Sequence, residues 1–259
     1  MKIPIYQIDA FAAECFKGNP AAVCPLEKWL TDEVMLAIAA ENNLSETAFF
    51  ITTENGFHIR WFTPTTEVAL CGHATLASAY VIFNELNYKN STILFDSKSG
   101  VLKVEKKDQL LIMDFPAQPP VACKTPKELE EAFGITPLFC LKSEDYIFFV
   151  ENEIDVINAN PDFDLLKKID LRGVSITSHS DEYDFISRFF APKYGINEDP
   201  VTGSAHTELA PYWAKRLNKN KLKAKQASAR GGELYCEVNH DRVNIAGYAT
   251  KYLQGEIII

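Results

Sequence analysis

The chain has 259 residues, enough for two domains of ordinary size or for one large one. Hydrophobic residues make up 47% of it and charged residues 24%, which is the composition of a globular protein with a full core. The net charge of −9 argues against nucleic acid or an anionic membrane as a partner and leaves a small anionic molecule possible.

No segment predicts a secretory leader or a membrane span. Asp9 interrupts the N-terminus before an apolar leader could develop, and the longest nearly apolar stretch, Val68–Phe83, is too short to cross a bilayer of about 30 Å. The six cysteines include no C-x-x-C pair, and the five histidines form no metal-binding cluster. We therefore expect reduced thiols, no metal site and a cytoplasmic location.

The first half of the chain predicts two helices among short strands. The segment 30–43, "LTDEVMLAIAAENN", has Thr31 as a candidate N-cap and acidic residues in its first turn. The segment 73–86, "HATLASAYVIFNEL", is small and apolar on nearly every face, which is typical of a helix buried on all sides. Runs rich in β-branched and aromatic residues predict strands at 47–53, 57–62 and 110–115.

Four prolines between residues 116 and 126 mark a crossover between two halves, because proline interrupts both helices and sheet ladders. Beyond them, strands are predicted at 145–151, 234–239 and 242–249. A helix is predicted over 204–217, where Pro211 introduces a kink or a late start.

The two halves share one short pattern. "RWFTPTTEVALCGHAT", residues 60–75, and "RFFAPKYGINEDPVTGSAHT", residues 188–207, both begin Arg-x-Phe-x-Pro and lead through a loop to Gly, a polar residue and Ala. A helix follows each copy. The pattern predicts two similar domains, each a curved sheet wrapped around one buried helix.

The start of each of these two helices is a candidate anion site. The first N–H groups of a helix lack partners within it, and a glycine lets an anion approach them closely. Gly72–His73–Ala74 and Gly203–Ser204–Ala205 could hold a carboxylate in this way, although two tight turns would also explain the glycines. Neither segment fits a nucleotide-binding motif.

Four motifs in order resemble the PhzF-like family of phenazine biosynthesis, which is itself similar in fold to diaminopimelate epimerase. They are "IDAFAAECFKGNPAAVC", "NLSETAFF", "FTPTTEVALCGHATLASAY" and "DPVTGSAH". The resemblance covers almost the whole chain. It implies an α+β fold of two pseudo-twofold-related domains, each a curved β-sheet or barrel around a central helix. We expect an N-terminal domain over 1–117, with the last strand, 253–259, as a candidate addition, and a C-terminal domain over 118–252.

The resemblance also implies the site. Glu46 matches the proton-transferring residue of the family, in an interdomain cleft where partial desolvation suits a carboxyl group to exchange protons near neutrality. His73 and Asp199 match polar residues that line the cleft and orient the substrate or relay protons. Gly72, Gly203 and Ser204 would donate hydrogen bonds to the carboxylate of the substrate. The resemblance implies a homodimer and no cofactor.

Two positions depart from related patterns. Diaminopimelate epimerase uses two opposed thiols, whereas here Cys71 has only Asp199, Val201 and Thr202 at the matching place in the second copy. Cys71 is therefore interpreted as a small buried hydrophobic residue. Arg230 precedes two glycines where the family has a Gly-Arg pair, so no binding role is assigned to it.

The function that we expect is a cofactor-independent isomerase of the PhzF type, which acts on 2,3-dihydro-3-hydroxyanthranilate in the named family. Its partner would be a small anionic metabolite, and Glu46 would move a proton within that metabolite by acid–base transfer. The alternatives are an amino-acid epimerase or racemase on the same site and a small-molecule-binding protein without turnover. A serine hydrolase built on Ser204, His206 and Asp199 is disfavoured because no G-x-S-x-G elbow is present.

Overall fold

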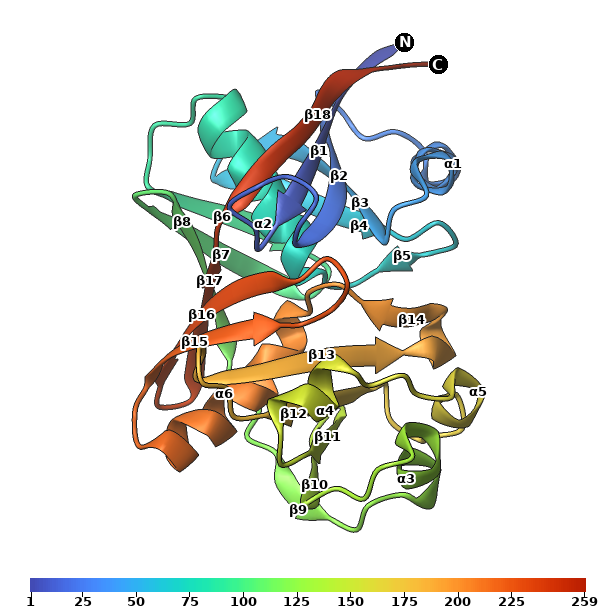
Figure 1. Cartoon of the computed structure of the whole chain (residues 1–259). Helices are drawn as coiled ribbons and strands as arrows, with labels where there is room; N and C mark the ends of the chain where they lie inside the picture. Colours follow the sequence, from blue (N-terminus) through green and yellow to red (C-terminus); the bar gives the residue numbers. More distant parts are fainter. The chain divides into compact units, whose positions relative to one another are not determined.

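The computed structural model describes residues 1–259, which form two compact units. The first unit comprises Met1–Asp114 and Ala246–Ile259, so both ends of the chain belong to it. The second unit comprises Phe115–Ile245. The strands and helices of both are labelled in Figure 1.

The sheet of the first unit is mixed, with mostly antiparallel and two parallel pairs of neighbouring strands. Strand pairs β18–β1, β1–β2, β3–β4, β4–β5, β6–β7 and β7–β8 are antiparallel, whereas β2–β3 and β4–β6 are parallel. The strands are β1 (Lys2–Ala10), β2 (Asn19–Leu26), β3 (Glu46–Thr53), β4 (Gly56–Phe62), β5 (Glu67–Val68), β6 (Thr92–Ser97), β7 (Gly100–Lys107), β8 (Leu110–Pro116) and β18 (Ala249–Ile258).

Helix α2 (Gly72–Tyr80) is the central helix of this unit and contacts β1, β2, β3 and β18 (Figure 1). Every residue from His73 to Ala79 is buried, and the alanines and Ser78 let the strands approach closely on all sides. The helix continues into one π-helical turn, η1 (Val81–Glu85), so the single helix predicted over 73–86 is two segments. The predicted buried helix is thus confirmed, with a change of winding near its end.

Helix α1 (Asp32–Asn42) covers β3 and β4 of the same unit. Thr31 occupies the predicted N-cap position, but its side chain makes no capping hydrogen bond, and Asp32 and Glu33 complement the helix dipole instead. Asn43 ends the helix in the left-handed conformation, which asparagine tolerates better than most residues.

The second unit repeats this order of strand pairs. Its pairs β9–β10, β10–β11, β12–β13, β13–β14 and β15–β16 are antiparallel, whereas β11–β12 and β13–β15 are parallel. The strands are β9 (Val121–Cys123), β10 (Phe139–Lys142), β11 (Tyr146–Phe149), β12 (Val174–Ser178), β13 (Phe185–Ala191), β14 (Ile196–Asp199), β15 (Lys221–Gln226), β16 (Gly232–Asn239) and β17 (Arg242–Gly247), the last of which runs into the first unit.

Helix α6 (Gly203–Leu217) is the counterpart of α2 and packs against β15 and β16. It passes through Pro211 without ending, and its buried residues include Ala205, Leu209 and Trp213, as the helical spacing predicts. The remaining helices are α3 (Lys127–Phe133), α4 (Glu153–Ile157), α5 (Phe163–Leu166) and the 3-10 turn η2 (Pro192–Tyr194). The predicted α+β class, with a curved sheet and a central helix in each half, is confirmed.

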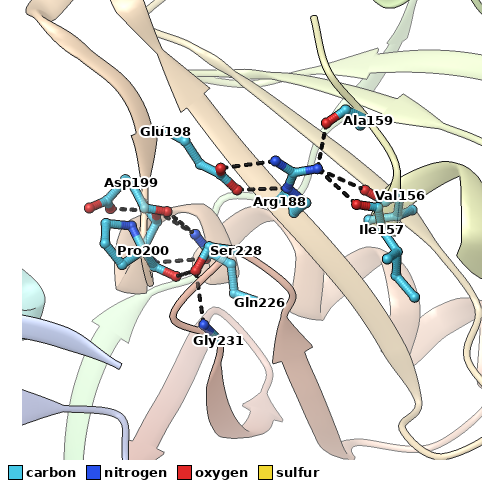
Figure 2. Close-up of polar contacts among 11 residues, drawn as sticks. Val156, Ile157, Ala159, Arg188, Glu198, Asp199, Pro200, Gln226, Ser228 and Gly231 are labelled. Atoms are coloured by element: carbon cyan, nitrogen blue, oxygen red, sulfur yellow. Dashed lines mark hydrogen bonds and ion pairs between the residues drawn. The ribbon is translucent and has the colours of Figure 1, made fainter. Parts of the chain in front are cut away.

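The repeated Arg-x-Phe pattern has the same structural role in both units. Arg60 of β4 forms a bidentate pair with Glu67 of β5, with N–O distances of 2.8 and 2.9 Å, and lies over the ring of Phe62 at 5.1 Å. Arg188 of β13 pairs in the same way with Glu198 of β14, at 2.6 and 2.9 Å (Figure 2). Each arginine thus ties down the hairpin strand that leads to the central helix.

Arg188 lies over the ring of Phe190 at 5.1 Å, as Arg60 lies over Phe62. Its second amino group donates to the carbonyl oxygens at the end of α4, those of Ile157 at 3.1 Å and Ala159 at 2.5 Å. The repeat seen in the sequence therefore reflects a duplicated ion-pair and stacking unit.

None of the helices combines the length and the apolar character that crossing a membrane requires.

Candidate functional site

Glu46 is the first residue of β3 and is carried into the interior by the strand that it begins. Its Cα lies opposite Ala21 of the parallel strand β2, and the residues that follow it, from Thr47 to Phe50, are all buried. The Glu46 residue is 9% exposed. A carboxyl group at such a position needs a polar partner, because a charge is rarely buried without one.

His73 supplies that partner from the first turn of α2. Its Nε2 lies 3.2 Å from Oε2 of Glu46, and the residue is 6% exposed. Burial lowers the pKa of His73 to about 3, so the imidazole is neutral at neutral pH. The contact therefore joins a carboxyl group to a neutral ring rather than to an imidazolium.

The neighbours of the other ring nitrogen assign the tautomer of His73. Nδ1 lies 3.3 Å from the amide nitrogen of Asn19 and 3.5 Å from Sγ of Cys71, and both of these groups can donate a hydrogen. Nδ1 is then the acceptor, and Nε2, which lies 3.2 Å from Oε2 of Glu46, carries the proton.

The start of α2 next to this pair has an open N-terminus. Cys71 is the N-cap residue, in an extended conformation, and its side chain makes no capping hydrogen bond. The side chain of Cys71 therefore does not cap the first backbone N–H groups of the helix, at Gly72, His73 and Ala74. Together with the helix dipole they favour an anionic group.

In the second unit, Asp199 ends β14 and is held by a buried network (Figure 2). Thr202 donates its hydroxyl to Oδ2 of Asp199 at 2.5 Å. Gln226, which is fully buried at the end of β15, donates its amide to the Asp199 carbonyl at 2.7 Å and accepts from the Thr202 backbone N–H at 2.8 Å. The loop from β14 to α6 is thus fixed on both sides.

Gly203 and Ser204 begin α6 directly after this loop. Thr202 is the N-cap residue and its side chain does not cap the helix, since its hydroxyl is directed at Asp199. Ser228 donates to the Pro200 carbonyl at 2.8 Å and accepts from the backbone of Gly231, which closes the network (Figure 2). The structure therefore gathers Asp199, Gly203 and Ser204 in one place within the second unit.

Two residues of these networks were missed in the sequence. Asn19 lies in the Gly-Asn-Pro part of the first family motif, but its contact with His73 joins residues 54 positions apart. Gln226 lies 24 positions from Thr202 and has no motif around it. A strand pattern that places Gln226 at an inward position would have been the one signal for it, because a fully buried glutamine needs partners.

Glu46, Cys71 and His73 also offer donor atoms of the kinds that zinc accepts, all within 4.8 Å of one another. The Cys71 sulfur and the Glu46 oxygen lie against opposite nitrogens of the imidazole, however. One of them would have to turn for a single ion to bind all three. The absence of a metal stays a prediction.

Another buried acid, Glu208, lies on α6 and took no part in the predicted site. The residue is 1% exposed. Burial, with a smaller contribution from Asp145, raises its pKa from 4.5 to about 8. Arg172 opposes this shift, but it is bound to both carboxylate oxygens of Asp145. Glu208 is therefore protonated at neutral pH.

Glu208→Gln is expected to remove part of the pH dependence of stability. Because the folded chain keeps the Glu208 proton up to about pH 8 and the unfolded chain loses it near 4.5, the free energy of unfolding falls as the pH rises between these values. The loss is about 1 kcal/mol per pH unit. Urea unfolding at about pH 5 and about pH 8 should show a smaller loss in the variant. Glu130→Gln, at an exposed position on α3, should show the same fall in the free energy of unfolding as the parent chain.

Comparison with known proteins places this geometry in context. The profile of the family described as "Phenazine biosynthesis-like protein" (PhzC-PhzF) matches residues 8–255. A Pseudomonas aeruginosa protein named as an uncharacterised isomerase is 51% identical over 99% of both chains. A protein of Halalkalibacterium halodurans with the same description is 48% identical over 100% of both. These relatives support an isomerase activity in general.

Solved structures agree with the fold. A PhzF-family protein of Enterococcus faecalis superposes with a TM-score of 0.98, at 49% identity, over 100% of both chains. A hydroxyproline epimerase of Agrobacterium vitis superposes with a TM-score of 0.65 at 8% identity, over 99% of this chain and 92% of that one. The second likeness concerns the fold alone, which is of the diaminopimelate epimerase-like type.

Proposed function

Because the chain belongs to the phenazine biosynthesis-like protein family, we propose that it moves a proton within a small carboxylate-bearing metabolite, with Glu46 as the acid–base group and without a cofactor. The observation that carries this proposal is the contact of Glu46 Oε2 with His73 Nε2, 3.2 Å apart on two buried side chains. General acid–base catalysis needs a titratable group that is held in place in this way.

The proposed reaction begins with Glu46 as a carboxylate. Glu46 takes a proton from a carbon next to a carbon–carbon double bond. The electron pair of the broken C–H bond forms a new double bond, and the displaced π electrons take the proton back from Glu46 at a second carbon. Substrate and product are isomers, so no co-reactant is consumed.

His73 positions the carboxyl group during both transfers. Burial lowers its pKa to about 3, so the ring stays neutral and takes up no proton from Glu46 near neutral pH. Asn19 fixes the ring from the opposite side. The open N-terminus of α2 would bind the substrate carboxylate through the N–H groups at Gly72 and His73.

The roles of Asp199, Gly203 and Ser204 remain predictions. The hydrogen bonds from Thr202 and Gln226 support a fixed Asp199, and the start of α6 offers backbone donors of the same kind as α2. A homodimer, expected from the resemblance, and a cytoplasmic location, expected from the cysteine pattern, likewise remain predictions.

The proposal is tested with a panel of unsaturated cyclic acids and amino acids, each incubated with the chain and followed by NMR. Migration of a double bond in one compound, by the parent and not by Glu46→Gln, is the expected result. Inversion at an α-carbon without migration would instead assign an epimerase. Tight binding of an acid that is never converted, equally by parent and variant, would assign a binding protein and contradict the proposal.

A further inference from the structure

Two cysteines of the second unit lie directly opposite each other on neighbouring strands. Cys123 is the last residue of β9, and its Cα partner in the antiparallel ladder is Cys140 of β10. Residues paired in this way have Cβ atoms about 4.5–5.5 Å apart, and a disulfide needs about 3.5–4.5 Å. Only a small movement of the short strand β9 therefore separates the pair from bonding distance.

The two side chains are also on the same face of the sheet. Both pack against the hydrophobic cluster of the second unit, where Cys140 is buried and Cys123 partly buried. The Cys123 thiol is near enough to Cys140 to add to the effect of burial, which raises the pKa of Cys140.

From this geometry we propose that Cys123 and Cys140 are a reversible redox site, which forms a disulfide between β9 and β10 in exchange with a small disulfide such as oxidised glutathione. The other buried cysteines have no such position: Cys24 and Cys236 lie opposite Phe49 and Leu222, and Cys71 lies against His73. The Cys15 thiol donates to the Lys251 carbonyl at 3.6 Å. The site belongs to the second unit and does not involve Glu46 or His73.

The exchange has a defined order. Burial raises the pKa of Cys140, so that its sulfur stays a thiol, whereas the half-buried Cys123 is accessible to solvent. The thiolate of Cys123 attacks oxidised glutathione and releases one glutathione thiolate. The sulfur of Cys140, losing its proton, then attacks Sγ of Cys123 and releases the second. Two protein thiols are oxidised and one small disulfide is reduced to two thiols.

The disulfide would tether β9 to β10 and enclose the segment 124–139, which contains α3. Closing a loop of this length restricts the unfolded chain. The oxidised chain is expected to unfold at a temperature about 5 °C higher than the reduced chain, and reduction with dithiothreitol should reverse the shift.

The test equilibrates the folded full chain in glutathione buffers from fully reduced to fully oxidised, blocks the remaining thiols and maps the peptides by mass spectrometry. The expected product is a peptide pair linked through Cys123 and Cys140. The number of free thiols in the chain should fall by two from the six of the reduced chain. Cys140→Ser should stop at a glutathione adduct on Cys123. Cys15→Ser, which removes another half-buried thiol, should leave the link unchanged.

Two results would overturn the proposal. In one, the parent chain carries glutathione on Cys123 and a free thiol on Cys140 in the most oxidising buffer. In the other, both thiols stay reduced there while Cys15 reacts. The first would mean that β9 and β10 hold the two sulfurs too far apart to bond, and the second that Cys123 is not accessible to glutathione.

Discussion

Glu46→Gln is expected to lower kcat by about 10³-fold on the substrate that the chain converts, while the fold is retained. Glutamine has nearly the volume of glutamate, and its amide can take the place of the carboxyl group beside Nε2 of His73. It cannot take up a proton from carbon. The measurement is kcat and KM of both proteins by NMR or absorbance, with circular dichroism to compare their folds.

Two further variants make this result specific. Glu46→Asp keeps the carboxyl group but shortens the side chain, so a partial loss of kcat is expected, since acid–base transfer depends on position. Glu54→Gln changes an exposed glutamate just beyond the opposite end of β3 and should leave kcat unchanged. If Glu46→Gln kept kcat within a few-fold of the parent, Glu46 would not be the proton carrier.

Gly18→Ala is expected to lower the free energy of unfolding by about 3 kcal/mol. Gly18 has a φ of +66°, which costs an alanine about 1 kcal/mol. A Cβ at this position would also lie 2.1 Å from the carbonyl oxygen of Ala10 and 2.9 Å from Cβ of Ala12, so the backbone of β1 would have to shift. The neighbouring Asn19 contacts His73, so kcat should fall as well.

Gly134→Ala is the matched control for this substitution. Gly134 has a φ of +63°, but a Cβ there would meet no atom within 4 Å. Gly134→Ala is therefore expected to lower the free energy of unfolding only by the cost of the left-handed backbone, about 1 kcal/mol. Urea unfolding of both variants separates the two contributions. Equal losses would show that the close approach of Gly18 to Ala10 contributes nothing.

The fold was largely predictable because hydrophobic pattern and repeat agreed. The run after Gly72 is apolar on every face, and the structure buries it on every face as α2. The Arg-x-Phe repeat led to two similar units, and Arg60 and Arg188 do have equivalent places. Their partners Glu67 and Glu198 were missed, because the two loops differ in length and no fixed spacing relates the glutamates.

The site was only partly predictable, for a physical reason. Motifs mark residues that are close in sequence, such as Gly72 and His73 at one helix start. The contacts that orient them come from distant strands, as with Asn19 on β2 and Gln226 on β15. The winding of the segment after Tyr80 was also missed, because a π-helical turn and an α-helix have nearly the same apolar pattern.

The most direct measurement of proton transfer through Glu46 is hydrogen exchange at carbon. The substrate is incubated in deuterated buffer with the parent chain or with Glu46→Gln, and deuterium in recovered substrate and product is counted by mass spectrometry. We predict that the parent introduces deuterium at a carbon of the acid and that the variant, which still binds the compound, introduces none. Equal deuterium incorporation by both proteins would contradict the role of Glu46.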